Sequence, residues 1–261
     1  MADHETTVTE VRGCRIALRR GGAGACMLYL HGAAGAGMWL PFMARLAESF
    51  DLVVPEHPGF GASETPPWLD NIHDVAYFYL DFLEALDLKH VHLVGSSLGG
   101  WIALEMAVRN SARLATLTLS APAGLHLEGV PKGDMFLWSP EETIRQLILD
   151  PDLREMLLSR QSSDEEVDIE LKNRETMARL AWSPRLYDPH LHKWLHRIEV
   201  PTHIIWGAGD RLLPPAYATR FHELIADSRV TLIPECGHLP HLEKTDAFCD
   251  AVTAFAKGAA S

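Results

Sequence analysis

Short apolar runs alternate with longer amphipathic stretches along most of the chain, a pattern typical of parallel strands joined by crossover helices. The apolar runs are rich in β-branched and aromatic residues, and most end at glycine or proline. They predict strands over residues 26–30, 51–55, 90–95, 114–122, 202–207 and 229–234. Stretches with apolar residues at helical spacing predict helices over residues 38–48, 72–86, 98–109, 215–226 and 244–257.

This alternation is interrupted once, between Ala123 and Glu199. The interrupting stretch is rich in Leu, Met, Glu and Arg at helical period, has several proline breaks, and contains no run that predicts a strand. We therefore predict an α/β fold in which residues 1–122 and 200–261 form a doubly wound, mostly parallel sheet with helices on both faces. Residues 123–199 are predicted to form a helical insertion, long enough to cover an active site.

Composition and charge narrow the class of protein. The chain has 261 residues, 47% hydrophobic and 22% charged, as in an ordinary globular protein. Its net charge of −12 repels nucleic acid phosphates and anionic lipid surfaces, so neither is an expected partner. The first residues lack the basic start and apolar run of a secretory signal, and the four cysteines form no C-x-x-C pair. We expect a cytoplasmic protein without a membrane anchor.

The most specific motif is GSSLGG, residues 95–100, which leaves a predicted strand and enters a predicted helix. A Gly-x-Ser-x-Gly sequence in that setting is typical of a nucleophile elbow, a strained turn that exposes a serine hydroxyl. Small residues are needed two positions before and after the serine. Ser97 meets this requirement through Gly95 and Gly99, whereas Ser96 does not, so Ser97 is the candidate nucleophile.

A serine hydroxyl needs a histidine as general base and an acid that orients the histidine. Asp210 directly follows the predicted strand THIIW, and His238 follows the predicted strand RVTLIP, so both are expected at the carboxyl edge of the sheet. The order Ser97, Asp210, His238 fits this architecture. His241 is the rival base, three residues later, but we expect it to lie in the last helix. Glu243 and Asp246 are interpreted as dipole partners at the start of that helix.

An oxyanion intermediate needs backbone N–H donors. One candidate is the N–H of Leu98, and the other is the N–H of Ala33 in the small-residue loop HGAAGAG, residues 31–37, with Ala34 as the neighbouring alternative. The same loop lacks a Walker lysine, which disfavours phosphate binding. His192 and His196 lie four residues apart, but we interpret them as part of a solvated helix, so neither a metal nor another cofactor is expected.

Taken together, HGAAGAG, the segment PGFGAS at residues 58–63, GSSLGG, WGAGDRLLPP and GHLPHLEK resemble the α/β-hydrolase fold superfamily along essentially the whole chain. The resemblance implies an eight-stranded sheet, a helical cap and a Ser-His-Asp triad. Relatives that open epoxides or remove halide carry aspartate where Ser97 stands, so these chemistries are disfavoured. Relatives that hydrolyse carbon–carbon bonds in ring-fission diketones often carry tryptophan after the catalytic histidine, where this chain has Leu239.

We therefore expect a serine hydrolase that cleaves a small carboxylic ester, or a related acyl compound, through an acyl-enzyme. Carbon–carbon bond hydrolysis is the enzymatic alternative. A ligand receptor that keeps the fold without turnover is the alternative of another class. The expected partner is a small-molecule acyl substrate, and the sequence leaves open whether the chain forms a homo-oligomer.

Overall fold

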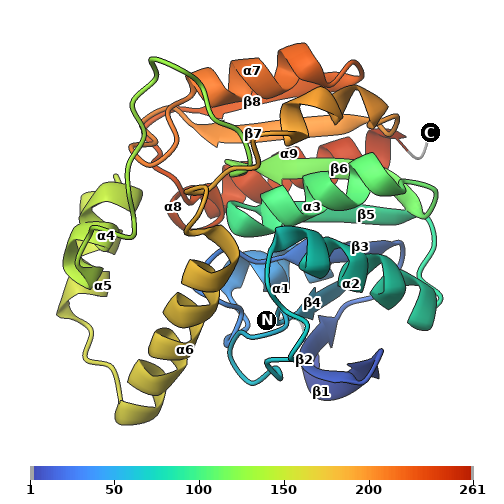
Figure 1. The fold of residues 1–261 in the computed structure, drawn as a ribbon, viewed down its shortest axis with the longest axis horizontal. Coiled ribbons are helices and arrows are strands. Elements are labelled where there is room, and N and C mark those ends of the chain that lie inside the picture. The colour runs from blue at the N-terminus through green and yellow to red at the C-terminus, as the bar shows by residue number, and fades with distance from the viewer. Residues whose placement is uncertain (1–2, 260–261) are drawn as a thin grey trace.

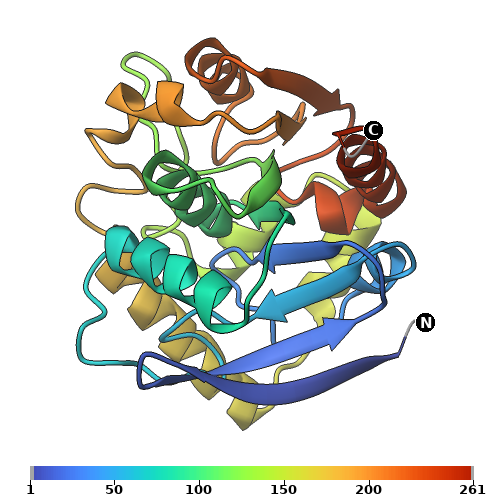
Figure 2. The same ribbon diagram turned by 90° about the vertical axis from the view of Figure 1, so that its right-hand side faces the viewer.

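The computed structural model describes residues 3–259, which form one eight-stranded sheet with helices on both faces (Figures 1 and 2). The strand order is β1-β2-β4-β3-β5-β6-β7-β8. The pairs β1–β2 and β2–β4 are antiparallel, and the other neighbouring pairs are parallel. This confirms the predicted α/β fold class. The strands are β1 His4–Val11, β2 Cys14–Gly21, β3 Cys26–Leu30, β4 Asp51–Pro55, β5 Val91–Ser96, β6 Leu114–Ser120, β7 Thr202–Gly207 and β8 Ser228–Ile233.

The first two strands form an edge hairpin that the hydrophobic pattern does not predict. Its two-residue turn is Arg12–Gly13, and both residues have positive φ, 52° and 76°, as a type I′ hairpin turn requires. Residues 4–9 of β1 are mostly exposed, because this strand lies at the sheet edge. This strand is stabilised by its hydrogen bonds to β2 rather than by burial of its side chains. Its sequence therefore contains no apolar run that would predict a strand.

Two hydrophobic cores lie on opposite faces of the sheet. One contains the buried sides of α2 Ile72–Ala85, α3 Leu98–Arg109 and α7 Ala216–Leu224. The other contains those of α1 Pro41–Ala47 and α9 Thr245–Ala259. The central strands are buried along their whole length, as expected where helices cover both faces. This rigid centre holds the strand ends from which the candidate site residues project.

Between β6 and β7 the chain forms the helical segment, residues 123–199, which contains α4 Pro140–Leu147, α5 Pro151–Ser159 and α6 Asp164–Ala181. Each helix begins at a side-chain cap, supplied by Ser139, Asp150 and Ser163 respectively. No residue of α4 or α5 is fully buried, and Figure 1 shows both helices standing away from the sheet. The buried residues of α6 cluster in its second half, from Asn173 to Ala181.

The end of the helical segment differs from the prediction at one point. His192 and His196 do not share an α-helix, because the chain there forms two 3-10 turns, η1 Leu191–Lys193 and η2 Leu195–Arg197. Leu191 and Leu195 point inward while both histidines are exposed. Within residues 3–259, no helix has the length and apolar character needed to cross a membrane.

Candidate active site

Ser97 lies on the sharp turn between β5 and α3, with φ 53° and ψ −111°. This positive φ is strained for a residue with a side chain. The turn is held by backbone hydrogen bonds: the Ser97 N–H donates to the Ser120 carbonyl, at 2.9 Å, and the Ser97 carbonyl accepts from Trp101 and Ala123. The surrounding strands and helix therefore fix a conformation that the serine would not adopt alone.

The two glycines of the turn are required by close backbone contacts. A Cβ on Gly95 would lie 2.5 Å from the Gly99 carbonyl oxygen, and a Cβ on Gly99 would collide with the carbonyl oxygen of Leu30. No side chain fits at either position, because the atoms that it would meet belong to the backbone. The sequence requirement for small residues on both sides of Ser97 thus has a direct structural cause.

The structure brings the side chains of Ser97, His238 and Asp210 into one hydrogen-bonded row. His238 Nε2 lies 2.9 Å from Ser97 Oγ, and His238 Nδ1 lies 2.7 Å from Asp210 Oδ2. Because a carboxylate only accepts, Nδ1–H donates to Asp210 and Nε2 accepts from the serine hydroxyl. The His238 and Asp210 side chains are almost completely buried, with 1% and 0% exposed. The arrangement can pass a proton between serine and imidazole.

Asp210 is fixed by its own loop after β7. Its second carboxylate oxygen, Oδ1, accepts the backbone N–H groups of Leu212 and Leu213, both at 2.9 Å. Charge-assisted hydrogen bonds of this kind orient a carboxylate strongly. Oδ2 is left to face His238.

Glu243 has a role that the sequence interpretation missed. It ends the short helix α8 Pro240–Glu243, which precedes α9. Its carboxylate accepts three backbone N–H groups, from Gly237 beside His238 and from Leu149 and Asp150 of the helical segment, at 2.7 to 2.9 Å. The interpretation as a helix-dipole partner was therefore wrong for Glu243, which ties the histidine loop to the helical segment. Only the contact between distant segments reveals it.

The same junction contains a direct backbone bond to the histidine. The His238 N–H donates to the Leu147 carbonyl at 2.8 Å. The chain between α4 and α5 thus lies directly against the loop that carries His238. Asp246, the other acid that we interpreted as a helix-dipole partner, forms an ion pair with Arg45.

The two expected oxyanion donors flank Ser97. A Cβ on Gly32 would lie 3.5 Å from Ser97 Cβ, which places the turn containing Ala33 beside the serine. In the part of the chain that the structure describes, neither the Ala33 N–H nor the Leu98 N–H donates to a protein acceptor. Leu98 is the first residue of α3, where backbone N–H groups have no partner within the helix. Both donors are free to bind an oxygen of a substrate.

His31 and His57 support the loop that carries Ala33. Their rings stack at a centroid distance of 3.7 Å, and the His57 N–H donates to His31 Nε2 at 3.0 Å. Tyr79 OH lies 2.6 Å from His57 Nδ1. Burial lowers the pKa of His31 to about 4 and that of His57 well below its usual range, so both rings are neutral. These contacts give His31 a structural role in the loop.

His241, the rival base, lies outside the row of site side chains. It is buried among the rings of Tyr29, Phe42 and Phe248. Burial, followed by the nearby His238, lowers the pKa of His241 to about 3. His241 is therefore part of the hydrophobic core.

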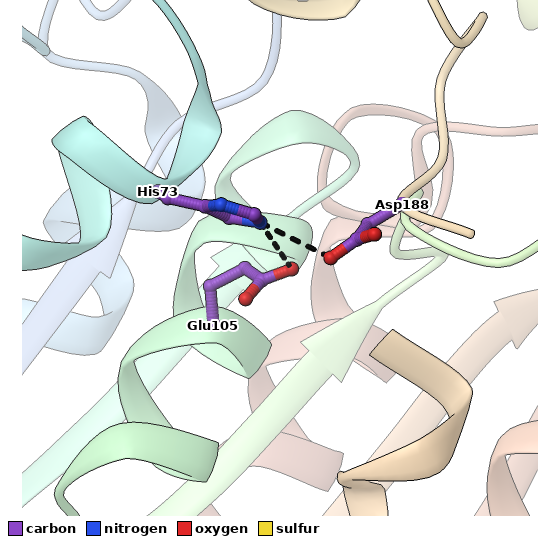
Figure 3. A group of neighbouring side chains, drawn as sticks. All are labelled: His73, Glu105 and Asp188. Carbon is purple, nitrogen blue, oxygen red and sulfur yellow. Dashed lines mark hydrogen bonds and ion pairs between the residues drawn. The ribbon is translucent and has the colours of Figure 1, made fainter. Parts of the chain in front are cut away.

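A second polar cluster, His73, Glu105 and Asp188, joins α2 and α3 to the end of the helical segment (Figure 3). One ligand-type atom from each lies within 4.8 Å of the others. His73 Nε2 is 3.1 Å from Asp188 and 3.6 Å from Glu105. These donor types suit a transition metal. However, Glu105 also pairs with Arg109 and accepts from Trp101 Nε1–H, so its carboxylate is already bound on both oxygens.

The charges of these side chains and of Arg109 account for the contacts in this cluster without a bound metal. The Arg109 guanidinium pairs with the Glu105 carboxylate, and His73 Nε2 contacts the carboxylates of both Glu105 and Asp188. The contact with the Glu105 carboxylate is the main cause that raises the pKa of His73, and burial opposes it. The cluster therefore serves as an ion-pair network. It holds Asp188, whose backbone N–H donates to the Gly124 carbonyl at the other end of the helical segment.

Comparison with known proteins identifies the family of the chain. Residues 26–245 match the family model described as alpha/beta hydrolase fold, so the chain belongs to the α/β-hydrolase fold family. It is 28% identical to 2-hydroxy-6-oxo-6-phenylhexa-2,4-dienoate hydrolase of Burkholderia cepacia, over 90% of this chain and 88% of that protein. It is 30% identical to monoacylglycerol lipase ABHD6 of Bos taurus, over 84% of this chain and 71% of that protein.

Solved structures show the same fold. A membrane phospholipase A superposes with a TM-score of 0.82 at 23% identity, covering 99% of this chain and 87% of that one. The meta-cleavage product hydrolase CumD of Pseudomonas fluorescens superposes with a TM-score of 0.80 at 22% identity, covering 97% of this chain and 98% of that one. With its sequence relatives, this makes the protein a hydrolase of this family, and the names of those relatives refer to different substrates.

Proposed function

We propose that the protein is a serine hydrolase that cleaves a small carboxylic ester, or a related acyl compound, through an acyl-enzyme on Ser97. The observation that carries this proposal is the hydrogen-bonded row Ser97–His238–Asp210, with separations of 2.9 and 2.7 Å. A free serine hydroxyl is a weak nucleophile, and a neutral imidazole held in the correct tautomer activates it. The relatives, which are described as a hydrolase and a lipase, support the same reaction class.

In the proposed mechanism, Ser97 Oγ attacks the carbonyl carbon of the substrate while His238 Nε2 takes the hydroxyl proton. The N–H groups of Ala33 and Leu98 bind the oxyanion that forms. The intermediate collapses as the bond to the leaving group breaks, and His238 returns the proton to that group. Water then attacks the acyl carbon, His238 again takes and returns a proton, and the acid leaves. Asp210 stabilises the imidazolium in both steps.

We also propose that the helical segment, residues 123–199, is a cap on a core formed by residues 1–122 and 200–261. Two contacts support this role. Leu147, Leu149 and Asp150 bond to the loop region of His238 and Glu243. The helix α6 bonds to the loops near Ala34 and Gly61. A cap so placed would decide the shape of the substrate that reaches Ser97.

Hydrolysis of a carbon–carbon bond is the second candidate function. The relatives described as 2-hydroxy-6-oxo-6-phenylhexa-2,4-dienoate hydrolases, 28% and 29% identical to this chain, favour it. Leu239 argues for the ester instead, because it stands after the proposed catalytic histidine where ring-fission relatives often carry tryptophan.

A substrate panel separates the two reactions. Purified protein and its Ser97→Ala variant would be assayed with p-nitrophenyl esters of graded chain length, a thioester, a lactone and 2-hydroxy-6-oxo-6-phenylhexa-2,4-dienoate. We expect the highest kcat/KM on a short ester, abolished by Ser97→Ala. Turnover of the dienoate alone would replace the ester proposal with the second candidate. Binding without multiple turnover of any substrate would instead indicate a receptor.

A further inference from the structure

The second half of α6 rests on the core through three neighbouring side chains, Lys172, Asn173 and Thr176. Lys172 Nζ donates to the carbonyls of Gly61 and Ser63, at 2.7 and 2.6 Å. Thr176 Oγ1 donates to the Gly59 carbonyl at 2.7 Å. All of these carbonyls belong to the segment 58–63, so Lys172 and Thr176 dock α6 on that segment alone.

Asn173 differs from its two neighbours because it bonds to two loops at once. Its Oδ1 accepts the Gly61 N–H at 2.8 Å, and its Nδ2 donates to the Ala34 carbonyl at 3.1 Å. The residue is only 3% exposed, so these bonds form away from water. A buried amide with both ends bonded specifies one arrangement of the groups that it joins, because leaving either end unpaired is costly.

The loop that Asn173 reaches is the one proposed to bind the oxyanion. The Gly35 N–H donates to the Gly32 carbonyl at 3.2 Å, which closes a turn with Ala33 and Ala34 at its centre. Residues 32–37 are all glycine or alanine, so they have almost no side chain with which to fix their own conformation. Gly35 has φ +87°, and a Cβ there would lie 2.9 Å from Asn173 Nδ2. The turn and the asparagine are therefore in direct contact.

A second anchor holds the far end of the same turn. The carboxylate of Glu56 accepts the N–H of Ala36 at 3.3 Å and the N–H of Ala62 at 3.0 Å. Glu56 belongs to the core and stays there whatever the helical segment does. Asn173 belongs to α6, so its bond to Ala34 exists only while α6 is docked.

We propose that Asn173 is a positioning residue that makes the geometry of the oxyanion-binding turn depend on docking of the helical segment. The inference rests on the proposed function for its consequence in catalysis. With α6 docked, the Asn173 amide holds the carbonyl of the Ala34–Gly35 peptide, and the N–H of that peptide donates to the carbonyl of the Gly32–Ala33 peptide, which carries the Ala33 N–H. With that bond missing, the turn samples other conformations and the donor is misplaced. A misplaced oxyanion donor lowers kcat more than it changes substrate affinity, because its bond strengthens in the transition state.

Three variants test this role. Asn173→Ala removes both bonds. Asn173→Asp is nearly isosteric and keeps the acceptor for the Gly61 N–H, but it replaces the donor to Ala34 with an oxygen. Lys172→Met is the matched control, since it removes two bonds from the same face of α6 without touching the turn. All three would be compared with the unmodified protein for kcat, KM, Tm and hydrogen–deuterium exchange of residues 31–37.

We expect Asn173→Ala and Asn173→Asp to lower kcat about 10- to 100-fold, with KM changing less than about threefold. The amide of Gly35, which closes the turn, should exchange at least about tenfold faster in both variants. Lys172→Met should lower Tm while leaving kcat within about threefold and exchange of the turn unchanged. Equal effects of Asn173→Asp and Lys172→Met on exchange and kcat would overturn the proposal, as would unchanged exchange in both Asn173 variants.

The exchange measurement separates this inference from the proposed function. If the unmodified protein hydrolyses nothing in the panel, the function fails, yet faster exchange in the Asn173 variants still supports the structural coupling. If hydrolysis depends on Ser97 but the turn is unaffected by Asn173, the function stands and the positioning role is wrong.

Discussion

His238 Nδ1 lies 2.7 Å from Asp210 Oδ2, in a position from which water is almost completely excluded. The other Asp210 oxygen is occupied by the N–H groups of Leu212 and Leu213. The loop after β7 thus fixes the carboxylate, and the carboxylate fixes the ring. These contacts bring together a histidine and an aspartate that are 28 residues apart in sequence.

Asp210→Asn tests this dependence. The amide can keep an oxygen toward Leu212 and Leu213, so the fold should remain, but its NH₂ then faces the Nδ1–H of His238. The ring must change its tautomer and can no longer accept the Ser97 proton. We expect kcat/KM to fall about 10³- to 10⁴-fold with Tm changed by only a few degrees. Steady-state kinetics and thermal unfolding measure both quantities, and a loss under tenfold would mean that the pair is structural.

Gly99→Ala tests the close packing of the elbow. In an ordinary helix this change is stabilising, but here the new Cβ meets the Leu30 carbonyl oxygen, which belongs to a central strand. We expect a loss of about 2–4 kcal/mol of unfolding free energy. Gly258→Ala in α9 is the control, because a Cβ there meets nothing within 4 Å and should cost nothing or stabilise by up to about 1 kcal/mol. Denaturant unfolding measures the unfolding free energy of both variants. Equal unfolding free energies of Gly99→Ala and Gly258→Ala would contradict the described packing.

The ion-pair network of Figure 3 predicts a pH dependence of stability. The pKa of His73 is raised mainly by its contact with the Glu105 carboxylate, and then by the charge of Glu105 and the hydrogen bond to Asp188, while burial and Arg109 oppose the shift. A pKa raised by folding means that the folded protein binds the proton more tightly. The contribution of His73 to the unfolding free energy is therefore complete below about pH 6.5, which is the pKa of histidine in the unfolded chain. This contribution disappears as the pH rises through the pKa of His73 in the folded protein.

His73→Gln should accordingly lower Tm at pH 6 and make little difference at pH 9. Because the His73 side chain is 43% exposed, we expect the effect to stay below about 1 kcal/mol. His192→Gln, at an exposed position in η1, serves as the control. Thermal unfolding across this pH range measures the difference in Tm between the native protein and the variant. A difference that grows as the pH rises would contradict the prediction.

The proximity of the candidate site residues could be predicted because each residue follows a feature that is local in sequence. Gly95 and Gly99 mark the elbow, and Asp210 and His238 come directly after apolar strands whose ends converge at one edge of the sheet. Parallel strands make this inference possible, since their carboxyl ends share an edge. The prediction places the residues near each other, and the structure supplies the distances.

The residues that the sequence did not reveal act through contacts between distant segments. Asn173 meets Ala34 across 139 positions, and Glu243 meets Leu149 across 94. An asparagine in a polar helix and a glutamate near a helix start look like solvated residues, because nothing local shows what packs against them. The β1 strand was missed for a related reason, as an exposed edge strand has no apolar run.

Removal of the Ser97 hydroxyl tests the central claim most directly. Ser97→Ala should keep the fold, with an unchanged circular dichroism spectrum and a similar Tm, and it should lower kcat for a short p-nitrophenyl ester by about 10⁴-fold or more. A folded Ser97→Ala protein that hydrolyses the ester at the native rate would contradict the account.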